Sequence, residues 1–233
     1  MVHESSAWAA RRAPRITAII ALRGPCEQIA ATLDSLARSR LRDFEIVLVN
    51  GGEGDGPRET ARDWISEHPR IPARLVVGDR SGLGMARNIG LDLARGAFSL
   101  ILDSGQELYP RCLEALAQAL EATPEMAFVY PIQEVTGAPE DFVNTGGDYL
   151  LSLFGWDRGR LHRESDIRAP ALIRTDRLRR LGGFPTDPHM AGFQGRDIWC
   201  RLADPGWPGQ LVPQVLARRP EWGASPTLSV PQP

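Results

Sequence analysis

The sequence predicts an α/β fold, a single domain over residues 15–219 in which helices flank a mostly parallel sheet. Between Arg15 and Pro131, short β-rich runs alternate with longer helical patterns, as in βαβ units. The runs are apolar enough to be buried on both faces, which is typical of parallel strands. A chain of 233 residues with 42% hydrophobic content can also bury a large core without a metal or a disulfide.

Four buried strands and four helices are predicted in the first part of this domain. The strands are expected at Ile16–Leu22, Phe44–Asn50, Arg74–Gly78 and Phe98–Leu102. Apolar residues at helical spacing predict helices at Glu27–Ser39, Arg58–His68, Gly84–Arg95 and Arg111–Ala122. The first three of these helices would be the crossovers of a parallel sheet.

The pattern becomes less regular after a predicted strand at Ala127–Tyr130. Residues 133–164 are rich in Gly, Asp and Asn and are interpreted as a surface excursion. Regularity returns with a predicted strand at Ala169–Arg174 and two helices, Thr175–Leu181 and Arg196–Ala203. The first of these helices should end at the glycine pair that follows it.

Both ends of the chain are expected to lie outside the domain. Residues 1–14 contain no long apolar run and are predicted to be extended or disordered, without a signal peptide. Residues 220–233 are rich in proline and are predicted to be an extended tail.

The bulk charge and the cysteines exclude several classes of protein. A net charge of -2 and a pI near 6.1 provide no basic field, so nucleic acid is not expected as a partner. The three cysteines are far apart and suggest neither a zinc cluster nor a disulfide framework. The expected location is the cytoplasm, where the chain could associate peripherally with the inner face of a membrane. Nothing in the sequence predicts an oligomeric state.

Five segments carry the strongest functional signal because they occur in a fixed order. The first two are Ile16–Leu22 and Thr32–Leu36. The other three are Phe44–Asp55, Gly82–Leu91 and Leu100–Ser104. This order resembles that of family 2 glycosyltransferases, which have the GT-A fold. The resemblance extends more loosely to residues 181–184 and 197–206.

The resemblance implies a site for a nucleotide-sugar donor at the carboxyl edge of the sheet, where open α/β sheets bind ligands. It assigns the base pocket and the diphosphate site to Leu22, Gly24, Asn50, Gly51, Glu53, Arg87, Asp103 and Ser104. A divalent cation, Mn²⁺ or Mg²⁺, would bind at Asp103 and bridge to the diphosphate. The implied reaction is an inverting transfer of a sugar, from a donor expected to be UDP-linked, onto a glycan, lipid-linked or protein acceptor.

The chain departs from the family pattern in three motifs. Asn50 and Gly51 stand where the family has two aspartates, and Gly105 replaces the second aspartate of the Asp-x-Asp motif. The place of the expected catalytic base reads Gln-Gly-Arg-Asp and ends at Asp197. Asp197 is one carboxylate considered for that base, and Glu164, Asp166 and Asp187 are the others.

Several readings remain open at this point. The departures are also expected of a degenerate member of the fold that has lost catalysis and acts as a scaffold or glycan-binding module. Asp103 could be only a turn residue or the N-cap of a helix ahead of Glu107. Arg87 and Asn88 could form a salt bridge and a cap within the fold.

Overall fold

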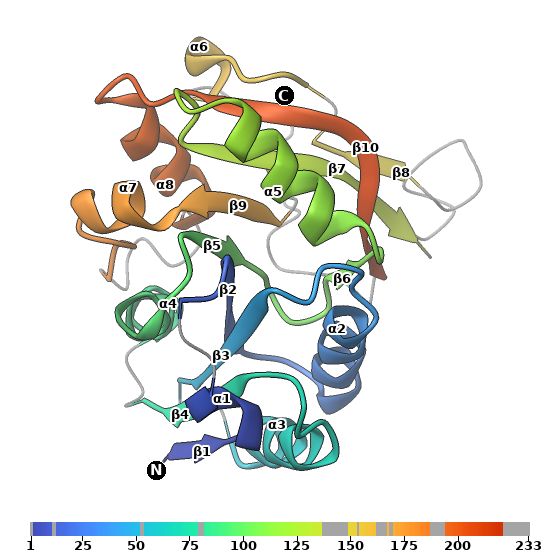
Figure 1. Cartoon of the computed structure of the whole chain (residues 1–233). Coiled ribbons are helices and arrows are strands. Elements are labelled where there is room, and N and C mark those ends of the chain that lie inside the picture. The colour runs from blue at the N-terminus through green and yellow to red at the C-terminus, as the bar shows by residue number, and fades with distance from the viewer. Residues whose placement is uncertain are drawn as a thin grey trace, which may run out of the picture.

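A computed structural model describes residues 2–10, 13–51, 54–78, 82–136, 149–152, 154–161, 167, 170–186 and 194–220. All strands belong to one mixed sheet in the order β1-β4-β3-β2-β5-β9-β7-β10-β6, and β8 pairs with β7 (Figure 1). Helices cover the sheet, so the predicted α/β class is confirmed.

The parallel core of the sheet consists of the four strands predicted from the first part of the sequence. They are β2 (Ile16–Leu22), β3 (Phe44–Asn50), β4 (Ala73–Val77) and β5 (Phe98–Ile101). All neighbours within this set pair in parallel, and Leu22 is the register partner of Asn50. Every residue of β2 and β3 is buried, as expected for strands covered on both faces.

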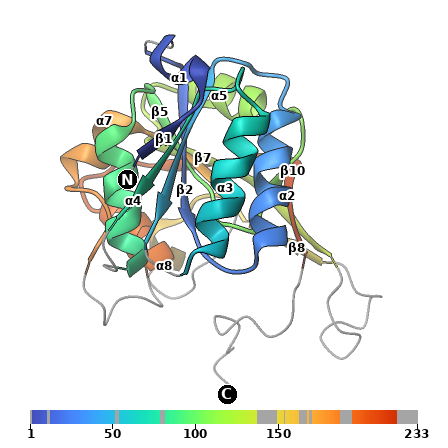
Figure 2. The same cartoon turned by 90° about the horizontal axis from the view of Figure 1, so that it is seen from below.

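Helices cover the two faces of this core. α2 (Cys26–Ala37) and α3 (Gly56–Glu67) lie on one face, and α4 (Gly82–Leu93) lies on the other (Figure 2). Side chains alternate accordingly along β2, because successive strand residues point to opposite faces. Ile20 belongs to the apolar cluster on the α2 side, and Ile19 clusters with Leu91 of α4.

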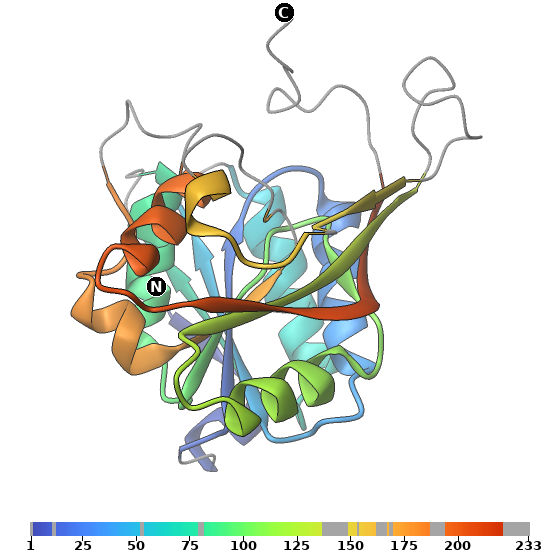
Figure 3. The same cartoon turned by 90° about the horizontal axis from the view of Figure 1, so that it is seen from above.

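The second part of the sheet is mainly antiparallel. β9 (Ala171–Arg174) pairs antiparallel with both β5 and β7 (Phe128–Thr136), whereas β7 and β10 (Gly209–Pro220) are parallel. The two short strands are β6 (Glu107–Leu108) and β8 (Tyr149–Leu151). β10 bends sharply beside β7, where its register shifts on either side of Val215 (Figure 3).

Four helices surround this second part. α5 (Cys112–Ala122) contacts β7, β9 and β10, and the other three are α6 (Arg158–Leu161), α7 (Thr175–Arg180) and α8 (Gln194–Ala203). α7 ends at Gly182 and Gly183, as predicted. Trp199 of α8 is buried and stacks on Phe128, with ring centroids 4.7 Å apart. This tryptophan is therefore a core residue.

The sequence analysis predicted an extended or disordered N-terminal segment, and this prediction is wrong for most of it. Val2–Glu4 forms β1, which pairs antiparallel with β4, and Ser6–Ala10 forms α1. Trp8 is buried, and the Arg95 guanidinium lies 3.9 Å from its ring centroid. This tertiary contact secures a segment that is too short to be recognised by periodicity. The predicted C-terminal tail lies, apart from Pro220, outside the described residues.

Candidate functional site

The predicted donor residues meet at the carboxyl edge of the parallel core. Leu22 and Asn50 end adjacent strands in register, and Asp103 follows β5, which pairs with the other side of β2. Two strand spacings of about 4.8 Å place the ends of β3 and β5 roughly 10 Å apart. That span suits a ligand of nucleotide size lying across the strand ends.

Asp103 begins a tight turn that is hydrogen-bonded to two other elements, β7 and α2. The Gln106 amide N–H donates to the Asp103 carbonyl at 3.0 Å, and the Asp103 N–H donates to Gln106 Oε1 at 3.0 Å. Gln106 Nε2 donates in turn to Gln133 Oε1 of β7 at 2.9 Å. The Gly105 N–H donates to Thr32 Oγ1 of α2, also at 2.9 Å. No helix begins here, so Asp103 is not a helix N-cap; β6 follows instead.

The ion pair between Arg87 and Asp103 is the main electrostatic feature of this edge. Arg87 Nη2 lies 2.5 Å from Asp103 Oδ1, and the Arg87 guanidinium carbon is 5.4 Å from the ring centroid of Phe184. The Arg87 side chain is only 8% exposed, whereas that of Asp103 is 52% exposed. Half of the carboxylate side chain is thus open to solvent or ligand.

The pKa of Asp103 reflects two opposing effects. Partial burial alone would raise the pKa of this carboxyl, because desolvation disfavours its charged form. The Arg87 guanidinium, with smaller contributions from Arg219 and Arg23, more than offsets this and holds the pKa below its ordinary value. Asp103 is therefore ionised at neutral pH, and its ion-pair partner is Arg87.

Asn88, next to Arg87 in the chain, is hydrogen-bonded to the backbone of Phe184. Its Nδ2 donates to the Phe184 carbonyl at 2.9 Å, and its Oδ1 accepts the Phe184 N–H at 2.7 Å. A Cβ on Gly183 would lie 2.3 Å from Asn88 Oδ1, and Gly183 has a φ of +77°. The glycine is required for this close approach. Arg87 and Asn88 thus form the predicted salt bridge and backbone cap, at the edge of the site.

The base-pocket residues are partly described. Asn50 is 2% exposed, and its Nδ2 donates to the Gly54 carbonyl across its own turn at 3.4 Å. Ser104 Oγ accepts the Arg23 N–H and donates to the Ala21 carbonyl, both at 3.4 Å. Ser104 therefore joins the turn after β5 to the loop after β2.

The other three residues predicted for the base pocket are Gly24, Gly51 and Glu53. Gly24 is exposed in the loop after β2, and Gly51 continues the chain beyond Asn50. Glu53 lies outside the described residues.

A family profile decides the relationship. The profile described as Glycosyl transferase family 2 matches residues 17–181, more than half of the chain. The chain belongs to glycosyltransferase family 2. The family that the order of segments suggested is therefore confirmed.

Curated relatives agree with the family. A candidate glycosyltransferase, EpsH of Bacillus subtilis strain 168, is 28% identical over 173 residues, which cover 68% of this chain and 50% of that protein. The PGL/p-HBAD biosynthesis glycosyltransferase of Mycobacterium bovis is 35% identical over 99 residues, which cover 42% of this chain and 38% of that protein. The chain spans half, or less, of the length of these relatives.

Solved structures show the same GT-A fold. The mannosyltransferase PcManGT of Pyrobaculum calidifontis, in complex with GDP-Man and Mn²⁺, is 26% identical with a TM-score of 0.65, covering 94% of this chain and 58% of its own. TarS 1–349 of S. aureus, in complex with UDP-GlcNAc, is 15% identical with a TM-score of 0.67, covering 93% and 61%.

In this family 2 member, the side chains at the Asp-x-Asp position do not provide the ligands that a divalent cation needs. Gly105 stands where the second carboxylate would be, with a φ of +90° and an added Cβ only 3.0 Å from Gln28 Oε1. Any side chain there would be strained. The remaining carboxylate, Asp103, is already paired with Arg87. Within the described part of the chain, no group of three or more His, Cys, Asp or Glu side chains could hold a metal.

Of the carboxylates considered for the base, the structure describes Asp197, whereas Glu164 and Asp187 lie outside the described residues. Asp197 lies in the first turn of α8, and its Oδ2 is buried, has no hydrogen-bond partner among the described residues, and is 3.8 Å from Arg201 Nη1. Arg201 also donates to the carbonyls of Leu181 and Gly183, beside the Phe184 backbone that Asn88 holds. Asp197 is thus connected to the Arg87 side of the site. Asp166 lies outside the described residues.

Sequence reasoning missed several residues of this site. Arg219 was overlooked because β10 was not predicted, and the role of Gln106 depends on Gln133 of β7, which lies far away in the chain. Asn88 was considered only as a cap, although the Leu-Gly-Gly-Phe segment at 181–184 was the signal for its partner.

Two hollows among the described residues lie elsewhere. One, of about 630 Å³, is lined by Ala7, Phe44 and Pro72 among others, and one of about 580 Å³ is lined by Gly96, Phe98 and Arg174 among others. Both lie where strands of the parallel core begin, and neither contains a predicted site residue. No helix in the described ranges has the length and apolar character needed to cross a membrane.

Proposed function

We propose that this chain transfers a sugar, with inversion, from a nucleoside diphosphate donor to a hydroxyl group of a glycan, lipid-linked or protein acceptor. The observation that carries the proposal is the position of Asn50 and Asp103 at one carboxyl edge, in a chain of glycosyltransferase family 2. Ligands of open α/β sheets bind at this edge.

The reaction needs two functions from the protein. The acceptor oxygen attacks the anomeric carbon while a base takes its proton, and the bond from that carbon to the β-phosphate oxygen breaks, leaving the nucleoside diphosphate. Asp197 is our candidate for the base, because it lies in the first turn of α8, where the family resemblance places the base, and its side chain is 24% exposed. Arg87 is our candidate for opposing the charge that builds up on the leaving diphosphate.

The nature of the donor rests on the relatives. PcManGT was solved with GDP-Man and TarS with UDP and with UDP-GlcNAc, so both have nucleotide-sugar donors as ligands. We propose a UDP-linked sugar as the donor, with a GDP-linked sugar as the competing choice.

The test is calorimetric titration of UDP-, GDP- and dTDP-sugars, each with and without Mn²⁺, followed by detection of released nucleotide. We expect one donor class to bind and to be turned over. Asp197→Asn should retain donor affinity and lower the turnover by about 100-fold or more, as for loss of a general base. Binding of no nucleotide sugar under either condition would overturn the proposal.

A second candidate function is a glycan-binding module or scaffold without catalysis. The rebuilt Asp103 turn favours it, because Gly105 and Gln106 leave one carboxylate where the family has more. This candidate predicts donor or glycan binding with no turnover, and with no difference between wild type and Asp197→Asn.

A further inference from the structure

We infer that Gln133, a buried residue of β7, is a positioning residue for the donor site and acts through Gln106 on the turn that begins at Asp103. The inference deepens the proposed function and rests on it, because it concerns the same edge of the sheet. Two hydrogen bonds make the connection: the Asp103 N–H donates to Gln106, and Gln106 donates to Gln133. We call this pair of hydrogen bonds the glutamine relay.

The first support is the direction of the glutamine relay. A backbone N–H can only donate, so the Asp103 N–H requires that Gln106 turn its Oε1 toward it, at 3.0 Å. Gln106 Nε2 then faces Gln133 and donates to its Oε1 at 2.9 Å. Neither amide group can be flipped without breaking a bond of the relay. Each glutamine therefore has one orientation that completes it.

The second support is an unpaired donor at the end of the glutamine relay. Gln133 is fully buried, and its Nε2 has no hydrogen-bond partner among the described residues. A buried amide donor without an acceptor lowers the stability of a protein. Because Gln106 fixes the orientation of Gln133, the amide cannot turn to avoid this loss. Such a departure from the rules of core packing is typical of functional sites.

The third support is the apolar row of side chains in which Gln133 lies. Its register partners are Leu151 of β8 and Ala217 of β10, and Ala217 is in turn the partner of Leu108 of β6. Register partners share one face of a sheet, so these four side chains form a row across four strands. Gln133 is the polar member of this row, and an apolar side chain in its place would leave no amide donor unpaired. Packing alone therefore does not explain the glutamine.

The fourth support is that the same turn is also held by a second element, α2. The Gly105 N–H donates to Thr32 Oγ1 at 2.9 Å, and Thr32 Oγ1 donates to the Gln28 carbonyl at 2.9 Å. With the backbone of the turn fixed by α2 and by the glutamine relay, the Asp103 carboxylate lies 2.5 Å from Arg87 Nη2. The turn thus presents the Arg87–Asp103 pair to a donor in one arrangement, as the positioning of a reacting group requires.

The experiment uses Gln133→Met in the full chain, because methionine keeps the length of the side chain and removes the acceptor for Gln106. UDP and GDP are titrated with and without Mn²⁺, and amide hydrogen exchange is measured at Asp103. We expect the affinity for the nucleotide that the wild type binds to fall about five- to tenfold, as for the loss of one hydrogen bond. Exchange of the Asp103 N–H should accelerate about tenfold, because its acceptor is no longer held in place.

Two further variants are the controls. Gln210→Met is the matched control, since Gln210 is a glutamine of the neighbouring strand β10 whose buried Oε1 also has no partner among the described residues. Its affinity and its exchange at Asp103 should stay within about twofold of wild type. Gln133→Glu keeps an acceptor for Gln106 and should keep Asp103 exchange within about twofold. Thermal melting of each variant confirms that it is folded.

A double-mutant cycle with Gln106→Met tests whether the two glutamines act together. The glutamine relay predicts that the double variant loses no more affinity than Gln106→Met alone. Losses that add, or a folded Gln133→Met with affinity within about twofold of wild type, would overturn the positioning role. Unaccelerated exchange at Asp103 in Gln133→Met would overturn the relay itself, and this readout needs no nucleotide. A wild-type chain that binds neither nucleotide would instead overturn the proposed function.

Discussion

Two arginine–carboxylate pairs lie at opposite ends of the parallel core. They differ in how far the protein buries the carboxylate and hydrogen-bonds to it. Glu45 and Arg95 lie where strands β3 and β5 begin, and Asp103 and Arg87 lie where strands end. Glu45 is 0% exposed and Asp103 is 52% exposed at the side chain. The chemistry of the two pairs is the same, but their surroundings are not.

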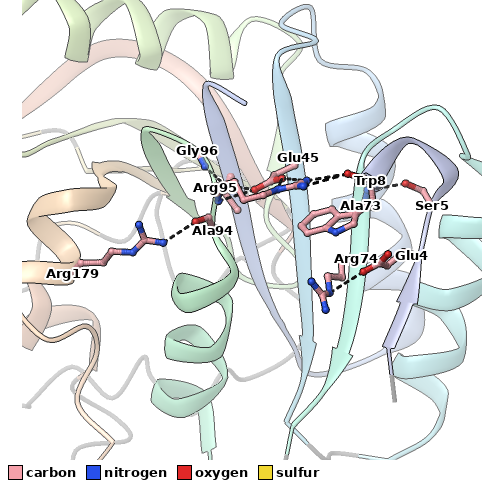
Figure 4. Close-up of polar contacts among 11 residues, drawn as sticks. Glu4, Ser5, Trp8, Glu45, Ala73, Arg74, Ala94, Arg95, Gly96 and Arg179 are labelled. Atoms are coloured by element: carbon pink, nitrogen blue, oxygen red, sulfur yellow. Dashed lines mark hydrogen bonds and ion pairs between the residues drawn. The ribbon is translucent and has the colours of Figure 1, made fainter. Parts of the chain in front are cut away.

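The Glu45 pair is saturated by the fold (Figure 4). Glu45 Oε1 accepts from Thr17 Oγ1 at 2.7 Å and from the Arg95 N–H at 2.9 Å, and Oε2 accepts from Arg95 Nε at 2.7 Å. The Arg95 guanidinium also donates to the Trp8 carbonyl. A buried ion pair is tolerated when its remaining acceptor sites are satisfied in this way.

The carboxylate of the Asp103 pair accepts fewer hydrogen bonds than that of Glu45. One oxygen accepts from Arg87, and the other charges that act on Asp103 come from arginines on separate elements. This comparison teaches that an ion pair whose carboxylate is enclosed by the fold is structural, whereas one whose carboxylate is left half exposed can respond to a ligand. The predictions below test that distinction.

The largest effect is expected for Glu45→Ala. It removes the acceptor of Thr17, of the Arg95 N–H and of the Arg95 side chain, so the free energy of unfolding should fall by about 3–5 kcal/mol. Urea unfolding measures the loss. Glu121→Ala, which breaks an exposed pair with Arg15, is the control and should cost less than about 1 kcal/mol. Equal losses in the two variants would contradict the comparison.

Trp8→Ala should have the next largest effect. The indole is buried against Arg95, and its loss should cost about 3 kcal/mol and release β1 from β4. Amide hydrogen exchange should accelerate at Leu75, whose N–H faces β1 and whose partner there is His3, while nucleotide affinity is unchanged. Unaltered exchange in β4 would show that the N-terminal segment does not depend on this contact.

Asn88→Ala should act on both stability and the site. Two hydrogen bonds to the Phe184 backbone are lost, which should cost about 2 kcal/mol and loosen the ring beneath Arg87. Donor affinity should fall together with stability. Asn88→Asp keeps the acceptor but sets a carboxylate oxygen against the Phe184 carbonyl, so its loss should equal or exceed that of alanine; a loss much smaller than that of alanine would argue against the bonds as the cause.

Asp103→Asn should have the smallest effect on stability, below about 1 kcal/mol, because the pair is half exposed and screened. Burial raises the pKa of Asp103, but Arg87 lowers it more, so the folded pKa is below the unfolded value of about 3.9. The stabilisation is therefore present above about pH 4 and is lost as the pH falls through the folded pKa. Unfolding of both proteins between pH 7 and pH 3 measures this; a difference that grows in acid would contradict it.

The sequence predicted the regular part of the fold well, and the irregular part less well. β2 and β3 are continuous apolar runs with helical patterns on either side, so local pattern and tertiary burial agree. β10 was missed because Pro213 and the charged pair Arg218 and Arg219 break its pattern, and only pairing with β7 and β6 makes it a strand.

The site divides in the same manner. The sequence alone determined the family, the strand ends that carry Asn50 and Asp103, and the replacement of a carboxylate by Gly105, because each depends on residue type and local order. Only the tertiary structure decided that Gln106 is held by Gln133 and that Arg219 acts on Asp103. Those contacts join distant segments, and their geometry is set by the pairing of distant strands in the sheet rather than by any local pattern.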